Sequence, residues 1–148
     1  MKIIIGCDHA GPALKEIVKQ HLTEIGHEVI DFGVNEGEKI DYPIMGERVG
    51  DAIVAGEADF GVLICGTGLG ISIAANKVPG VIAACVSEPT SARLAREHNG
   101  ANIIAFGTRV VGEEAAIDIV DAFFGATPMG GRHEKRRALF AEIEARHK

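Results

Sequence analysis

The chain has 148 residues, 47% hydrophobic and 24% charged, which is typical of one globular domain, and we expect that domain to span residues 1–148. Its formal net charge is −6, so its overall field would repel nucleic acid and anionic membrane surfaces. We therefore expect no nucleic-acid partner and no membrane association, and an anionic ligand would need a local cluster of basic side chains.

Apolar runs of strand length alternate with segments of helical period along the whole chain. Pro12 suits a first helical turn, and Gly26 suits the residue after a helix end. In chain order the predicted elements are a strand over 2–7, a helix over 12–25, a strand over 27–33, a helix over 43–57, a strand over 59–66, a helix over 71–76, a strand over 81–87, a helix over 89–98, a strand over 101–107, and helices over 113–124 and 132–147.

This alternation predicts an α/β fold with a parallel sheet covered by helices on both faces. In the last helix we expect Leu139, Phe140 and Ile143 to be buried, since they are the apolar residues of an otherwise charged segment. Ligands of such sheets bind beyond the carboxyl ends of the strands. Reactive and anion-binding residue types follow several predicted strands, namely Asp8, His9, Cys65, Ser87, Glu88, Thr108 and Arg109.

Three glycines, Gly66, Gly68 and Gly70, follow the third predicted strand and precede a short helix. Their amides can approach an oxyanion closely at a helix N-terminus, so the loop predicts an anion cradle; the alternative is a tight turn that only aids packing. The loop is not a phosphate-binding P-loop, because Ile71 stands where lysine would be needed. A dinucleotide site with Glu88 as the ribose-binding acid stays open as a weaker alternative.

Cys65 stands directly before this loop, where nearby amides would stabilise a thiolate, although most buried cysteines act only as small hydrophobes. A cysteine phosphatase is excluded, because the required arginine six residues later is replaced by Ile71. Cys7 and Cys85 lie inside apolar runs, and we expect both in the core. Three cysteines in a chain without secretory features predict reduced thiols and a cytoplasmic protein.

Two histidines, His9 and His98, are expected to face one cleft, because each follows the end of a predicted element. A metal site built from them with Asp8 and Cys65 lacks any close ligand spacing, so we expect no metal. Near the C-terminus, Arg132 and Arg136 are four residues apart on one helix face, with His133 between them. They predict either a phosphate clamp or a solvated basic face.

Several short motifs occur in order along the chain: GCDHAG, DYP, ICGTGLGISIAANK, SEP, EHN, GTRVVG and GGRHEKR. Together they resemble the type B ribose-5-phosphate isomerases, whose wider family includes allose-6-phosphate and galactose-6-phosphate isomerases. The resemblance implies a three-layer α/β/α Rossmann-like sandwich with a five-stranded parallel sheet. It also implies no cofactor, and a homodimer, often paired into a tetramer, whose sites are shared between subunits. The helix over 132–147 is then expected to contribute to the dimer and to the phosphate site.

The resemblance also implies the roles of individual residues. Cys65 matches the base that moves a proton between C1 and C2, and the apolar Ile71 stands where one branch of the family has a glutamate base instead. His98, helped by Thr67, matches the group that opens the sugar ring. The backbone of the loop Gly66, Thr67, Gly68, Leu69 and Gly70 would hold the enediolate oxygens. The remaining implied contacts are Asp8, His9, Tyr42 and Asn99 to the sugar, and Arg109, Arg132 and Arg136 to the phosphate.

The expected reaction is therefore the interconversion of ribose 5-phosphate and ribulose 5-phosphate through an enediolate. Other phosphorylated sugars, including allose 6-phosphate, galactose 6-phosphate and a tetrose phosphate, are alternative substrates, because small differences near Tyr42, His9 and Asn99 set the depth of the pocket. A non-catalytic module that binds nucleotide or phosphate is the alternative from another functional class, although simple binding would not need Cys65 and His98 together.

Overall fold

Strands and helices alternate along the chain as predicted, in a computed structural model that describes residues 1–147. The boundaries agree with the predicted ones to within a few residues. The elements are β1 Lys2–Cys7, α1 Pro12–Glu24, β2 Glu28–Gly33, α2 Tyr42–Val54, β3 Phe60–Cys65, α3 Leu69–Asn76, β4 Ala83–Cys85, α4 Pro89–Glu97, β5 Ile103–Gly107, α5 Glu113–Phe124 and α6 Arg132–Arg146.

The strand predicted over 81–87 is much shorter than expected, since β4 covers only Ala83–Cys85. Two asparagine side chains take backbone hydrogen bonds at its start. Asn102 Oδ1 accepts from the N–H of Ile82 at 2.8 Å, and Asn76 Oδ1 accepts from the N–H of Ala83 at 2.8 Å. These side chains satisfy backbone donors that a longer strand would pair with a neighbour.

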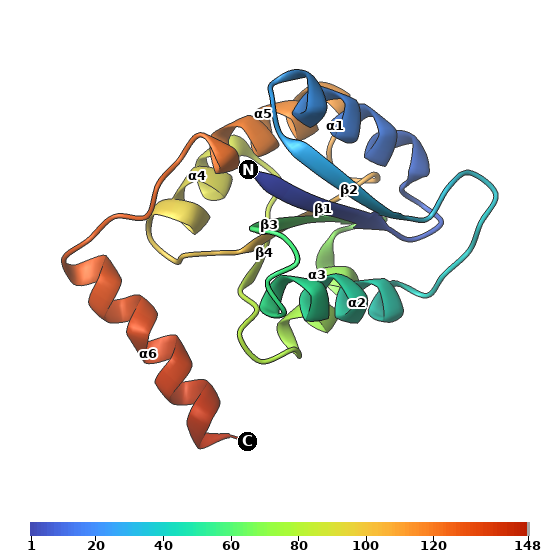
Figure 1. Ribbon diagram of the computed structural model, residues 1–148. Coiled ribbons are helices and arrows are strands. Elements are labelled where there is room, and N and C mark those ends of the chain that lie inside the picture. Colours follow the sequence, from blue (N-terminus) through green and yellow to red (C-terminus); the bar gives the residue numbers. More distant parts are fainter. Residues whose placement is uncertain (148) are drawn as a thin grey trace.

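The five strands form one parallel sheet in the order β2-β1-β3-β5-β4, which confirms the predicted fold class. Figure 1 shows the sheet between two layers of helices, with α1, α4 and α5 on one face and α2 and α3 on the other. Each face has its own apolar cluster. Phe106 and Phe123 lie in the first cluster, and Met45 and Leu63 lie in the second; all four are fully buried.

The direction of winding changes between β1 and β3. The chain passes from β1 to β2 on one side of β1, and then crosses to β3 on its other side. The loops that leave the carboxyl ends of β1 and β3 therefore diverge and leave a crevice between them. Cys7 is paired with Ile64 in this register, so Asp8 and Cys65 lie at the mouth of that crevice.

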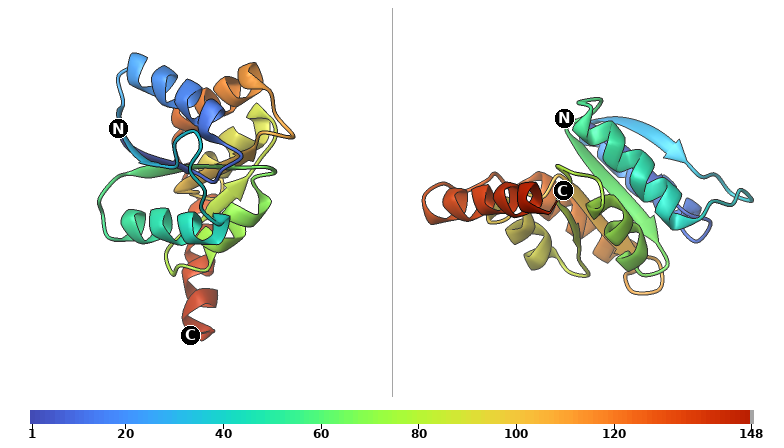
Figure 2. Two further views of the ribbon diagram at one scale, coloured as in Figure 1. Left: turned by 90° about the vertical axis from the view of Figure 1, so that its right-hand side faces the viewer. Right: turned by 90° about the horizontal axis from the view of Figure 1, so that it is seen from below.

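Helix α6 projects from the rest of the molecule, as Figures 1 and 2 show. Leu139, Phe140 and Ile143 were predicted to be buried, and this was wrong for the single chain, where they are 46%, 42% and 46% exposed. Contacts to His98 and Glu97 near its start and to Gly80 near its end fix the helix to the body, and among residues 1–147 its apolar side chains stay largely exposed. Among residues 1–147, no helix is both long and apolar enough to span a membrane.

Candidate active site

The glycine loop between β3 and α3 places one amide directly on the thiol of Cys65. Gly68, the residue before α3, has a φ of +82°, and a β-carbon there would lie 2.7 Å from the Cα of Phe106. Only glycine suits that position. The backbone turns so that the N–H of Gly68 donates to Cys65 Sγ at 3.1 Å. The sulfur of Cys65 therefore lies at the start of a helix with a backbone donor directed at it.

The loop is held against the end of β5. The N–H groups of Thr108 and Arg109 donate to the carbonyl oxygens of Cys65 and Gly66, at 3.0 and 2.9 Å. A β-carbon on Gly107 would overlap the backbone of Thr67, so the two segments pack without a gap. These contacts bring Arg109 over Gly66, as the sequence predicted for strands that end at one edge.

Asp8 and Tyr42 complete the same edge of the sheet. Asp8 is 5% exposed, and its carboxylate accepts the N–H of Ala10 at 2.9 Å, which fixes the turn after β1. The ring of Tyr42, at the start of α2, packs on the backbone of Gly70 so closely that a β-carbon there would overlap it. The structure thus brings these two residues to the glycine loop.

His9 lines a cavity of about 370 Å³ whose other wall the sequence analysis missed. That wall is formed by Lys39, Ile40, Asp41 and Ile44. The motif DYP marked Asp41 and Tyr42, but Lys39, Ile40 and Ile44 belong to no motif and show no periodicity that marks them as part of a site. The loop reaches His9 because it joins β2, the edge strand next to β1, to α2, which packs on one face of the sheet.

The structure separates the remaining predicted residues from Cys65. Helix α4 starts beyond the carboxyl end of β4 and returns to the amino end of β5, so His98 and Asn99 lie at the opposite edge of the sheet. The length of β5 alone, from Ile103 to Gly107, separates the two edges by about 13 Å. The expectation that His9 and His98 face one cleft is therefore wrong within a single chain.

Arg132 and Arg136 lie with His98 at that far edge. The segment before α6 is tied to the end of α4, because the N–H of Met129 donates to the carbonyl oxygen of Glu97 at 2.8 Å. Among residues 1–147, no acidic side chain lies within ion-pair distance of either arginine or of Arg109. Each chain thus carries two groups of candidate residues at opposite edges of the sheet, here called half-sites: one has the thiol of Cys65, and the other has His98 with two arginines that form no ion pair among residues 1–147.

The other two cysteines differ from each other. Cys7 is fully buried as predicted, and burial raises the pKa of its thiol to about 11. Cys85 was predicted to be in the core, and this was wrong: it is exposed at the end of the short edge strand β4. Its thiol donates to the carbonyl oxygen of Thr67 at 3.7 Å.

Glu88 does not act as a free ribose-binding acid. Its carboxylate caps α4 by accepting the N–H of Ser91 at 2.9 Å, and hydrogen bonds from Ser91 lower the pKa of Glu88. This contact removes the main observation in favour of a dinucleotide site. Among residues 1–147, no three histidine, cysteine or acidic side chains are grouped closely enough to hold a metal ion.

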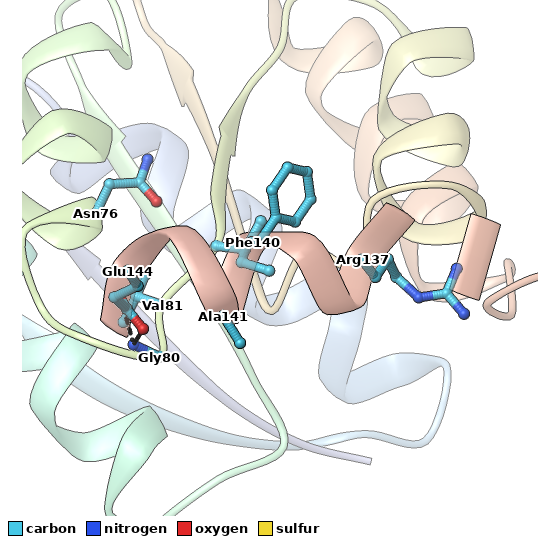
Figure 3. Close-up of a pocket in the computed structure, with 8 residues that line it drawn as sticks. Asn76, Gly80, Val81, Arg137, Phe140, Ala141 and Glu144 are labelled. Carbon is cyan, nitrogen blue, oxygen red and sulfur yellow. Dashed lines mark hydrogen bonds between the residues drawn. The ribbon is translucent and has the colours of Figure 1, made fainter. Parts of the chain in front are cut away.

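A second cavity, of about 360 Å³, lies between α6 and the segment that enters β4 (Figure 3). Phe140 and Ala141 face it from the helix, and Val81 and Ile82 line it from the body. The Glu144 carboxylate accepts the N–H of Gly80 at 3.1 and 3.2 Å and anchors the last turns of α6 there. This groove is at the amino edge of the sheet, away from Cys65.

Residues 3–139 match a family described as ribose/galactose isomerase. The chain is 53% identical to ribose-5-phosphate isomerase B of Escherichia coli over 145 residues, which cover 98% of this chain and 97% of the relative. It is 44% identical to the galactose-6-phosphate isomerase subunit LacB of Clostridium acetobutylicum over 126 residues, which cover 85% of this chain and 73% of the relative.

Two solved structures are similar over nearly the whole chain. Ribose-5-phosphate isomerase B of Clostridium thermocellum matches with a TM-score of 0.97 and 52% identity, covering 100% of both chains. The enzyme of Mycoplasma genitalium, with bound ribulose-5-phosphate, matches with a TM-score of 0.91 and 40% identity, covering 97% of this chain and 96% of that one.

Proposed function

Because the chain belongs to the ribose/galactose isomerase family, we propose that it interconverts ribose 5-phosphate and ribulose 5-phosphate. The observation that carries the proposal is the thiol of Cys65, which lies at the mouth of the crevice and receives the N–H of Gly68 at 3.1 Å. Simple phosphate binding needs the loop but not the thiol.

The proposed proton transfer uses Cys65 as a thiolate. The thiolate removes the proton from C2 of the open-chain aldose, and the electrons of that bond form the C1–C2 double bond while O1 takes the negative charge. The amides of the glycine loop stabilise this enediolate. The thiol then returns the proton to C1, and the hydroxyl proton of O2 moves to O1, which leaves the ketose.

The ring must open before this step, because the aldose is mostly a closed furanose. His98, with Thr67, is proposed to move the proton between the anomeric hydroxyl and the ring oxygen. Asp8, His9, Tyr42 and Asn99 are proposed to contact the sugar. Arg109, Arg132 and Arg136 would bind the phosphate, whose remote binding energy orients the reacting carbons.

These roles require two copies of the chain, because His98, Asn99, Arg132 and Arg136 are at the opposite edge of the sheet from Cys65. We propose a twofold dimer in which each copy places its far half-site on the thiol half-site of the other. Exposed apolar side chains support a covered interface. They are Leu69 and Ile73 on α3, and Leu139, Phe140 and Ile143 on α6.

Further pairing of dimers into a tetramer stays a prediction. We also propose a cytoplasmic location. Its support is the thiol chemistry, which needs a reducing compartment, together with the free cysteines of the chain.

A kinetic comparison of sugar phosphates tests the proposal. Purified protein in EDTA is expected to convert ribose 5-phosphate with a higher kcat/KM than allose 6-phosphate, galactose 6-phosphate or erythrose 4-phosphate. A preference for galactose 6-phosphate would support the alternative suggested by the LacB relative. Absence of turnover with every sugar phosphate, together with thermal stabilisation by nucleotides, would favour the non-catalytic module.

A further inference from the structure

His133 differs from the rest of its helix. It is 7% exposed and is the one buried side chain of α6, while Arg132 and Glu134 on either side of it are exposed. A histidine is a poor choice for a purely structural anchor on a charged helix, because leucine or phenylalanine would bury more apolar surface. The burial of the His133 ring therefore indicates a specific contact with another side chain.

That partner is His98. The two imidazole rings stack with their centroids 4.0 Å apart and an angle of 5° between their planes. The backbone of His98 is fixed as well, because Arg137 Nη1 donates to its carbonyl oxygen at 3.4 Å, and its own N–H donates to the carbonyl oxygen of Leu94 at 2.8 Å. Helix α6 thus holds both the ring and the main chain of His98.

The charges around the pair favour a neutral His133. Burial lowers the pKa of His133, and His98 and the guanidinium groups of Arg132, Arg136 and Arg137 lower it further. No carboxylate among residues 1–147 forms an ion pair with either ring. A neutral, flat ring can support His98 without adding a proton of its own to the site.

We propose that His133 is a positioning residue for ring opening: its ring holds the imidazole of His98 at the angle at which it meets the sugar. This inference rests on the proposed function. It also explains why His133 lies between two proposed phosphate ligands. The phosphate of ribose 5-phosphate is joined to the ring through C5, so a phosphate clamp and a ring-opening group must be held at a fixed separation. The start of α6 carries Arg132 and Arg136 and also His133, whose ring contacts that of His98.

Two substitutions of His133 distinguish the effect of a stacked ring from the effect of a side chain that only fills the same space. His133→Phe keeps a flat ring, and His133→Leu fills the space without one. We expect His133→Leu to lower kcat for ribose 5-phosphate by about 10- to 100-fold, since small misplacements of a reacting group have effects of this order. We expect His133→Phe to stay within about threefold of the wild type, and KM to change little in both. Lys135→Ala, exposed on the same helix, is the matched control.

A second measurement separates ring opening from the proton transfer at Cys65. Ribulose 5-phosphate is open-chain, so exchange of its C1 proton with solvent deuterium reports the Cys65 step without ring opening. In His133→Leu this exchange should be unchanged while conversion of ribose 5-phosphate falls. Size-exclusion chromatography and circular dichroism check assembly and folding; if His133→Leu fails either check, His133→Gln, which also lacks an aromatic ring, replaces it.

Three results would overturn the inference: full activity without an aromatic ring, equal losses in the Phe and Leu variants, or a loss of deuterium exchange parallel to the loss of conversion. A wild-type protein that cannot convert ribose 5-phosphate would instead refute the proposed function itself. The two failures are therefore distinguishable in one set of assays.

Discussion

At the scale of single residues, the surroundings of each thiol decide what it can do. Cys7 donates to the carbonyl oxygen of Val34 at 3.5 Å inside the core, and its pKa of about 11 keeps it protonated at neutral pH. Cys85 is exposed on a short edge strand. Cys65 alone combines a strand end, a crevice and a backbone donor on its sulfur. The three residues have the same chemistry, and only their positions distinguish them.

Replacement of Cys65 by alanine should therefore remove most of the turnover and leave phosphate binding in place. Loss of a general base typically lowers kcat by about 10²–10⁴-fold. We expect a loss in this range for Cys65→Ala, with competitive-inhibitor affinity by calorimetry within a few-fold of the wild type. Cys85→Ser, which keeps a donor for Thr67, is the control and should keep its turnover. Normal turnover in Cys65→Ala would remove the thiol from the mechanism.

At the scale of elements, a buried ion pair ties α1 to β2. Lys15 is completely buried, and its Nζ donates to both carboxylate oxygens of Asp31, at 2.9 and 2.7 Å, and to Asn35 Oδ1 at 3.3 Å. Lys19, which is 36% exposed, reaches the same carboxylate at 3.0 Å. Asn35 begins the loop that leads to the His9 cavity, so the pair also anchors a wall of the candidate site.

Lys15→Met should be far more costly than Lys19→Met. Removal of one partner from a buried pair costs about 3 kcal/mol or more, whereas an exposed partner contributes under about 1 kcal/mol. Urea unfolding at pH 7 measures both free energies. Equal losses of unfolding free energy in the two variants would show that the burial of Lys15 does not increase its contribution to stability.

The same pair predicts a pH dependence. Burial alone would raise the pKa of Asp31, but hydrogen bonds from Lys15, Gly33 and Lys19 outweigh it and lower this pKa. A lowered folded-state pKa adds stability above the unfolded value, and this stability is lost as the pH falls below about 4. Lys15→Met should therefore lose less stability than the wild type between pH 5 and pH 2, by urea unfolding at each pH. An equal loss of stability in the wild type and in Lys15→Met over this pH range would contradict the prediction.

The packing of β5 against the glycine loop gives a second prediction at this scale. A β-carbon on Gly107 would overlap backbone atoms of Thr67, and backbone atoms cannot move aside as the end of a flexible side chain can. A β-carbon on Gly112 would meet nothing within 4 Å. Gly107→Ala should displace the loop and lower kcat by about 10²-fold, and Gly112→Ala should not. Steady-state kinetics of the two variants test this prediction. An unchanged kcat in Gly107→Ala would show that the loop is not displaced.

At the scale of the whole molecule, the proposed reaction would need two copies of the chain, because the two half-sites lie at opposite edges of the sheet. A parallel strand followed by a helix must return the chain to the amino edge, so α4 carries His98 away from Cys65 in its own copy. The exposed apolar face of α6 and the groove in Figure 3 are surfaces that a second copy would cover.

Mixing two inactive variants tests this arrangement. When Cys65→Ala and His98→Ala are refolded together in equal amounts, half of the dimers are heterodimers. Each heterodimer has one intact site and one site that lacks both residues. The mixture should regain roughly a quarter of wild-type activity if sites are shared across a twofold axis. Each variant refolded alone is the control. Absence of any recovery would mean that both residues act within one chain.

The sequence by itself determined the alternating fold, the glycine loop and the thiol before it, because these depend on local periodicity and on residues adjacent in the chain. The alternation also contained an unused signal: a helix between parallel strands ends at the amino edge, which predicts where His98 lies. Only the tertiary structure decided which residues meet. It exposed Leu139, Phe140 and Ile143, buried His133 on His98, and brought the loop before α2 to His9. Such contacts join segments that are distant in the chain, so they depend on the packing of whole elements and not on local pattern.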